Sequence, residues 1–143
     1  MSDASAQSFT NHTRWDPPFH FILMPFALVS VIGMGWRLWV NQDLKHVWLF
    51  LFSLAFMGAL LKVRLNALKV QDRVIRLEET LRLTRLGAAA TVIGALQAGQ
   101  FVALRFASDG EVVALAQRAV TEQLEPKVIK AAIKDWRADN FRV

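Results

Sequence analysis

The chain has 143 residues, of which 54% are hydrophobic and 20% charged, and its formal net charge at pH 7 is +5. It contains no cysteine, which excludes disulfides, thiolate metal sites and a cysteine nucleophile. The hydrophobic fraction is high for a soluble domain, and the excess cations lie close to apolar stretches, where they would face anionic lipid headgroups rather than nucleic acid.

Residues 1–18 are expected to form a flexible segment, because residues 1–13 are small and polar. Residues 19–36 then carry no charge, over a length close to the ~20 residues that cross ~30 Å of hydrocarbon. Pro25 lies inside this stretch and predicts a bend, because a proline leaves one helical carbonyl without its donor. We interpret the bend as an ordinary kink rather than a hinge or a ligand niche.

Residues 47–61 form a second uncharged stretch after a short polar gap at residues 41–43. Its flanking cations can reach toward the headgroups and lengthen the span, and tryptophans cluster near the gap, as they do at membrane interfaces. The two stretches predict a transmembrane helical hairpin over residues 19–63. Within it, Ala55 and Ala59 have the small-xxx-small spacing of close helix contacts, which predicts that they lie against Ala27 and Ser30.

The charges that follow the second stretch predict the orientation of the hairpin. Residues 62–76 contain five cations and one anion, whereas the gap is flanked by Arg37 and Lys45 and contains Asp43. By the positive-inside rule the segment after the second span is cytoplasmic, and two spans place the N-terminus there too. We expect a multi-pass protein of the bacterial cytoplasmic membrane with both termini in the cytoplasm.

Residues 64–86 continue the second span without a breaker, which predicts one helix of ~40 residues that extends into the cytoplasm as an amphipathic stalk. Apolar side chains recur along it at alternating spacings of four and three residues, as in a coiled-coil seam. The seam fits either packing against the chain's own tail or self-association. Its members are Val63, Ala67, Val70, Val74, Leu77, Leu81 and Thr84, and Val70, Val74, Leu77 and Leu81 are the candidates for self-association.

Residues 87–143 predict a small helical cytoplasmic module without a sheet. Gly87 is expected to end the stalk, residues 88–99 to form a joint with at most one helical turn, and residues 100–107 to form a short helix. Ser108 and Glu111 have the spacing of a capping box, which predicts a helix from there to about residue 124. Pro126 then opens the last helix.

Residues 127–143 predict an amphipathic last helix with a basic polar face. It would either lie on the inner leaflet or bury Ile129, Ile133 and Trp136 against the stalk or the preceding helix. We favour packing, because a module this small gains from every apolar face that it can bury.

The candidate lipid-binding or partner-binding residues are cations that flank the spans or lie in the last helix. They are Lys62, Arg64, Lys69, Lys127, Lys130, Lys134 and Arg137. No catalytic residue, metal site or cofactor is predicted. His20 and His46 begin opposite ends of the hairpin, ~25–30 Å apart, and His12 has no metal-site spacing with His20.

Several strings resemble an uncharacterised bacterial family of two-span membrane proteins, a domain of unknown function. They are Asn11-His12-x-Arg14, Pro18-Phe19-His20-Phe21, Leu68-Lys69-Val70-Gln71-Asp72-Arg73-Val74-Ile75-Arg76-Leu77-Glu78-Glu79, Ala103-Leu104-Arg105-Phe106-Ala107-Ser108-Asp109 and Ile133-Lys134-x-Trp136-Arg137-Ala138-Asp139. The resemblance spans nearly the whole chain, although Gly110 stands where the pattern leads us to expect an acidic residue. The resemblance implies an integral membrane protein, but it implies no activity, cofactor or catalytic residue.

These observations lead us to expect an accessory or scaffold protein that acts by interaction and is not an enzyme. The alternative is a small subunit of a larger membrane transport or electron-transfer complex without a cofactor of its own. The expected partners are a bilayer with anionic headgroups and either further copies of the chain or a larger membrane complex, and no nucleic acid.

Overall fold

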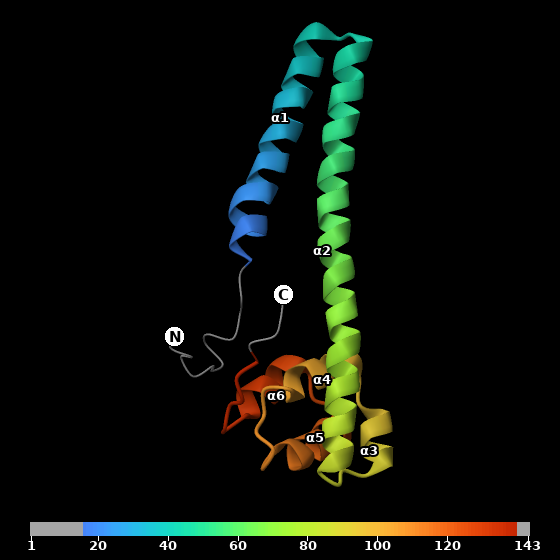
Figure 1. Cartoon of the computed structure of the whole chain (residues 1–143), viewed down its shortest axis with the longest axis vertical. Coiled ribbons are helices and arrows are strands. Elements are labelled where there is room, and N and C mark those ends of the chain that lie inside the picture. Colours follow the sequence, from blue (N-terminus) through green and yellow to red (C-terminus); the bar gives the residue numbers. More distant parts are fainter. Residues whose placement is uncertain (1–15, 140–143) are drawn as a thin grey trace. The chain divides into compact units, whose positions relative to one another are not determined.

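The computed structural model describes residues 16–139, which divide into two compact units, 16–68 and 69–139 (Figure 1). Of the segment predicted to be flexible, 1–18, residues 1–15 fall outside the described residues, as does Val143 at the end of the expected last helix, whereas Pro18 already begins a helix. The elements are η1 (Pro18–Leu23), α1 (Met24–Asn41), α2 (Leu44–Arg85), α3 (Ala90–Ala95), α4 (Ala98–Leu104), α5 (Val112–Thr121) and α6 (Pro126–Ala132). The predicted all-helical class is confirmed for this part of the chain.

The first unit is a helical hairpin of η1, α1 and the N-terminal half of α2. The irregularity expected at Pro25 is present as the π-helix η1, in which the N–H of Met24 donates to the carbonyl of Phe19, five residues back. This wider turn shifts the hydrogen-bond register immediately before a residue that has no N–H to donate. Asp16 accepts hydrogen bonds from the N–H of Phe19 and, through its carbonyl, from Nδ1 of His20.

The turn of the hairpin is tighter than the predicted gap and is built from two polar residues. Gln42 ends α1 in the left-handed region, with φ of 48°, and its N–H donates to the carbonyl of Leu38. The carboxylate of Asp43 then accepts a hydrogen bond from the N–H of His46, with an N···O distance of 2.8 Å. This bond satisfies a backbone donor in the first turn of α2 that has no partner within the helix.

The predicted hairpin contact at Ala55 and Ala59 is wrong, because both residues are exposed. The buried residues of this unit are Ala27 and Ser53, and Gly35 approaches α2 closely enough that an added Cβ would lie 3.3 Å from the ring of Phe50. Gly35 therefore supplies the close approach that we had assigned to small residues on the other helix.

Helix α2 runs unbroken over 42 residues, as the absence of a breaker predicted, and ends at Arg85, two residues before the Gly87 that was expected to end it. Gly87 has φ of +80° and its N–H donates to the carbonyl of Thr84, while the N–H of Ala88 donates to the carbonyl of Leu83. This pair of bonds defines a Schellman motif. Leu83 belongs to the core of the second unit, and Ala88, which the motif brings close to it, packs against that core.

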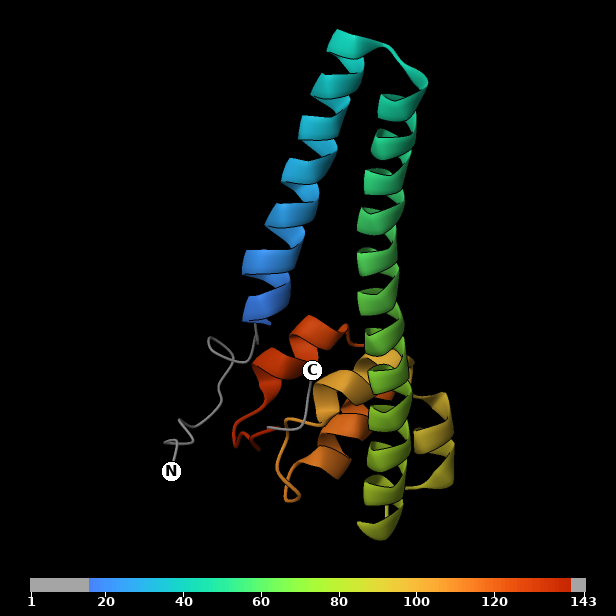
Figure 2. The same cartoon turned by 45° about the horizontal axis from the view of Figure 1, so that its top comes forward.

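The second unit packs α3 to α6 and the C-terminal half of α2 around one hydrophobic core (Figures 1 and 2). Its largest fully buried side chains are Leu83, Phe101, Leu104, Phe106, Val112 and Ile129. Helices α4 and α6 lie side by side in both views, and a Cβ added at Gly99 would meet the ring of Pro126 at 2.9 Å. A residue without a side chain is therefore required where these helices meet.

The segment predicted to be a joint contains the six-residue helix α3, and α4 begins two residues before the expected start. The predicted capping box at Ser108 is wrong, because α5 begins at Val112. The carboxylate of Glu111 instead accepts the N–H groups of Lys134 at 3.2 Å and Asp135 at 3.0 Å. Glu111 thus holds the C-terminal segment of the chain rather than the start of a helix.

The predicted last helix is correct at its start and wrong beyond residue 132, where α6 ends. The chain then forms an isolated antiparallel bridge between Ala107 and Trp136. The N–H of Arg137 donates to the carbonyl of Phe106 at 2.7 Å, and the N–H of Ser108 donates to the carbonyl of Asp135 at 3.0 Å. These long-range bonds replace the helical ones that residues 133–137 would otherwise make.

The interpretation that the last apolar residues pack within the module agrees with the structure. Ile129 is fully buried and Ile133 is 7% exposed. Trp136 packs against the core with its ring centroid 5.3 Å from that of Phe106.

Candidate functional site

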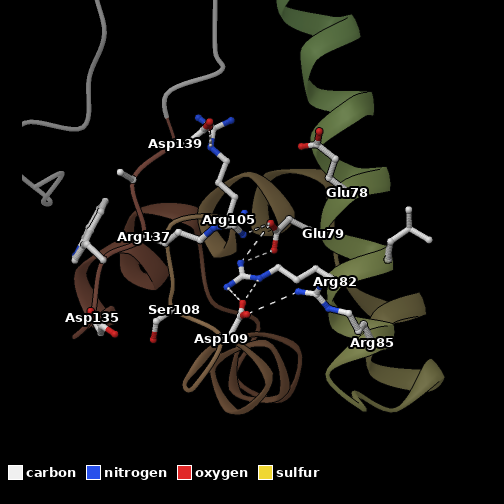
Figure 3. A pocket seen from close by; sticks show the side chains of 13 residues that line it. Glu78, Glu79, Arg82, Arg85, Arg105, Ser108, Asp109, Asp135, Arg137 and Asp139 are labelled. Atoms are coloured by element: carbon white, nitrogen blue, oxygen red, sulfur yellow. Dashed lines mark hydrogen bonds and ion pairs between the residues drawn. The ribbon is translucent and has the colours of Figure 1, made fainter. Parts of the chain in front are cut away.

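The second unit contains an open pocket of about 980 Å³ between α2, the 105–109 segment and the 135–139 segment (Figure 3). Its lining is mainly charged. The charged lining residues are Glu78, Glu79, Arg82, Arg85, Arg105, Asp109, Asp135, Arg137 and Asp139. The five carboxylates and four guanidiniums nearly cancel, so the pocket does not present one sign of charge to a ligand.

Arg82 is the centre of this pocket and is almost fully buried. Its Nε donates to the carboxylate of Asp109 at 2.6 Å, its Nη1 to the carboxylate of Glu79 at 3.0 Å, and its Nη2 to the carbonyl of Ala107 at 2.7 Å. A planar guanidinium suits such a set of acceptors. These bonds fix the segment after α4 to helix α2, and they commit Arg82 to the structure rather than to a ligand.

The two carboxylates bonded to Arg82 have opposite electrostatic environments. Burial raises the pKa of Glu79, and this effect outweighs the lowering by Arg82 and Arg137. The hydrogen bond from Arg82 lowers the pKa of Asp109, which is more exposed. Arg137, a predicted lipid-binding or partner-binding residue, lies 3.8 Å from the Glu79 carboxylate.

The remaining lining groups supply charge and one hydroxyl. Arg105 forms an ion pair with Asp139 at 3.2 Å, and Ser108 is the hydroxyl-bearing residue of the lining. No histidine lines the pocket, and no group of three or more metal-ligating residues occurs among residues 16–139. The pocket is therefore built as a network of ion pairs that holds α2, residues 107–109 and residues 135–139 together.

Helix α2 also carries an exposed apolar stripe, and one of its residues, Leu81, lines the pocket as well. We define this exposed stripe as Val70, Val74, Leu77 and Leu81, whose exposed fractions are 60%, 47%, 61% and 63%. The same turns of the helix bury Ile75 and Leu83 in the core. At about 100° per residue, the exposed stripe and the buried set lie roughly 150° apart around the helix. The four candidate self-association residues are thus brought together on one open face.

The predicted cationic residues do not form one patch. In the hairpin unit, Lys62 is exposed, whereas Arg64 forms an ion pair with Asp16 at 3.3 Å and lies 5.5 Å from the ring centroid of Phe19. In the second unit, Lys69, Lys127 and Lys134 are exposed, Arg137 joins the charged pocket, and Lys130 lies over the ring of Phe106.

Sequence reasoning missed the ion-pair network. It gave no reason to expect Glu79 and Arg82 inside the module, because charged residues are seldom buried. One signal was available: Ile75, Glu79, Arg82 and Leu86 follow helical spacing on the face opposite the seam.

The fold therefore defines an all-helical protein in which a long helix links an apolar hairpin to a small helical module. The chain belongs to DUF6526, a family of unknown function, whose family model matches residues 1–143. This confirms the resemblance to a domain of unknown function. No curated protein and no solved structure matches the chain.

Proposed function

We propose that the protein is a membrane-anchored interaction protein. In this proposal, the hairpin spans the bacterial cytoplasmic membrane, both termini are cytoplasmic, and the module with its exposed stripe binds other protein chains as an accessory or scaffold subunit. No chemical reaction is assigned to it.

The apolar hairpin supports the membrane part of the proposal. Two helices, Pro18–Asn41 and Leu44–Arg85, are long and apolar enough to cross a membrane, and only 6% of each apolar window is buried. A core helix of a soluble protein would be mostly buried. Side chains such as Phe52, at 73% exposed, and Phe21, at 66%, instead face outward, where lipid would cover them.

The distribution of cations supports the orientation. Lys62 and Lys69 are exposed on α2 where the apolar stretch ends, and lysines there favour the cytoplasmic side. Lys127 and Lys134 are exposed as well and are further candidates for contact with anionic headgroups or with a partner.

The exposed stripe is the observation that carries the interaction part of the proposal. It lies among charged residues after the apolar span, so it belongs outside the hydrocarbon region. Four large apolar side chains in a row on one helix face would remain in water unless another chain covers them. Such a row is the pattern by which amphipathic helices recognise a helical partner.

Quantitative mass spectrometry of proteins that co-purify with the tagged full chain from native membranes tests this function. The wild type is compared with Leu77→Asp and with the control Val128→Asp, which alters an apolar residue on α6 that is 48% exposed. We expect Leu77→Asp to lose a protein, either another chain or a second copy, that wild type and Val128→Asp retain. Identical partners for all three would contradict the proposal.

A further inference from the structure

We propose that the exposed stripe binds a second copy of the same chain as a parallel two-stranded coiled coil, in register. This inference rests on the proposed function and names its partner. It follows from the heptad spacing of the stripe, from the charges on its two sides and from the common orientation that a membrane imposes on two copies.

The spacing places each residue of the exposed stripe at a core position. With Val74 and Leu81 at position a, Val70 and Leu77 fall at position d. These four are the side chains that the fold leaves exposed, whereas Ile75, Glu79 and Leu83 are buried within the chain. The core of the module therefore packs on the side of α2 away from the a/d seam, and the seam stays exposed, with Leu81 also lining the charged pocket.

Charge complementarity selects a second copy in parallel orientation. Arg73 and Glu78 flank the exposed stripe by roughly 70° on opposite sides at the helical repeat of about 100° per residue. They occupy positions g and e, and in a parallel pair in register each g residue faces the e residue five positions later on the partner. Arg73 of each copy thus faces Glu78 of the other. The next such pair, Thr80 with Arg85, brings no like charges together.

Arg73 and Glu78 are exposed. Glu78 also lines the charged pocket, and its negative charge adds to the effect of burial in raising the pKa of Glu79. Arg73 and Glu78 are five residues apart on one helix, so they do not face each other within a copy, where the neighbours are three and four residues apart. Their complementarity is realised between copies. The two heptads from Val70 are short for a free coiled coil, and confinement of both copies to one membrane would raise their effective concentration.

Reversal of these charges provides a test in the full-length, membrane-inserted protein. Two copies with different tags are co-expressed, and the recovery of one with the other is measured after mild solubilisation. Arg73→Glu in both copies, or Glu78→Arg in both, places like charges opposite each other twice and is expected to weaken association roughly tenfold. Arg73→Glu in one copy with Glu78→Arg in the other restores both pairs, and so does the double variant paired with itself.

The control is Asp72→Lys, which changes an exposed charge on α2 outside the exposed stripe and is expected to leave recovery unchanged. If wild-type copies associate but the complementary combinations do not recover, the parallel, in-register pair is refuted. If wild-type copies do not associate at all, the second-copy partner is refuted. The proposed function still stands in that case if Leu77→Asp loses a different protein that wild type retains.

Discussion

Leu81 and Leu83 are two residues apart on α2 and have opposite environments: Leu83 is fully buried in the core of the module, whereas Leu81 is 63% exposed. The same helix thus supplies both the core of its own unit and the exposed stripe. Leu83→Ala is expected to destabilise the protein by about 2–5 kcal/mol, through lost burial and the cavity left behind. Leu81→Ala is expected to cost much less. Chemical denaturation of the full chain in detergent measures both, and equal losses would contradict the two-faced helix.

Helices α2 and α5 are each followed by a residue in the left-handed region, which gives a matched pair of substitutions. Gly87, two residues after α2, has φ of +80°, and Gln123, two residues after α5, has φ of 49°. A residue with a Cβ is disfavoured there, so Gly87→Ala should lower the free energy of unfolding by about 1 kcal/mol and Gln123→Gly should raise it by a similar amount. Thermal unfolding followed by circular dichroism measures both. The same sign for both substitutions would contradict these end conformations.

Gly99→Ala and Gly94→Ala form a second matched pair of substitutions, because both add one methyl group to a helical glycine but the two sites differ in the space around them. A Cβ at Gly99 would lie 2.9 Å from the ring of Pro126, whereas one at Gly94 would meet nothing within 4 Å. Gly99→Ala is expected to cost about 1–3 kcal/mol through overpacking between α4 and α6. Gly94→Ala is expected to be neutral or stabilising, since alanine favours a helix. A neutral Gly99→Ala in the same unfolding assay would contradict the close approach of these helices.

The bond from Arg82 to Asp109 predicts a pH dependence. Because the pKa of Asp109 is lowered in the folded state, its stabilising contribution is present above the ordinary value of 3.8 and is lost as the pH falls through the folded-state pKa. Asp109→Asn is therefore expected to lower the unfolding midpoint at pH 7 and to differ less from wild type at pH 3. The control is Asp72→Asn, which removes an exposed carboxylate elsewhere on α2. An unchanged midpoint at pH 7 would show that the bond does not stabilise the fold.

The sequence predicted the features that depend on local patterning. The long helix followed from the continuation of the second span through residues 64–86 without a breaker, and its end followed from Gly87, which can adopt positive φ at no steric cost. The burial of Ile129 and Ile133 followed from their spacing on one helix face.

The errors lie where distant backbone or side-chain groups compete with local signals. Glu111 satisfies the local pattern of a capping box, yet it binds the N–H groups of Lys134 and Asp135. The helix expected beyond residue 132 gives way to a bridge with Ala107, a partner that no local pattern identifies. The buried Arg82 network escaped prediction because its stability depends on Asp109 and Ala107, both remote in sequence.

We have proposed that the apolar hairpin spans the membrane and holds the module on the cytoplasmic side. Labelling of single cysteines in intact cells tests it most directly, since the native chain has no cysteine. Asn41→Cys, at the end of α1, and Ala90→Cys, at the start of α3, place one thiol on each expected side, and both positions are exposed. An impermeant maleimide is expected to label position 41 alone until the cells are lysed, when position 90 also reacts. Labelling of position 90 in intact cells, or of neither position before lysis, would contradict the claim.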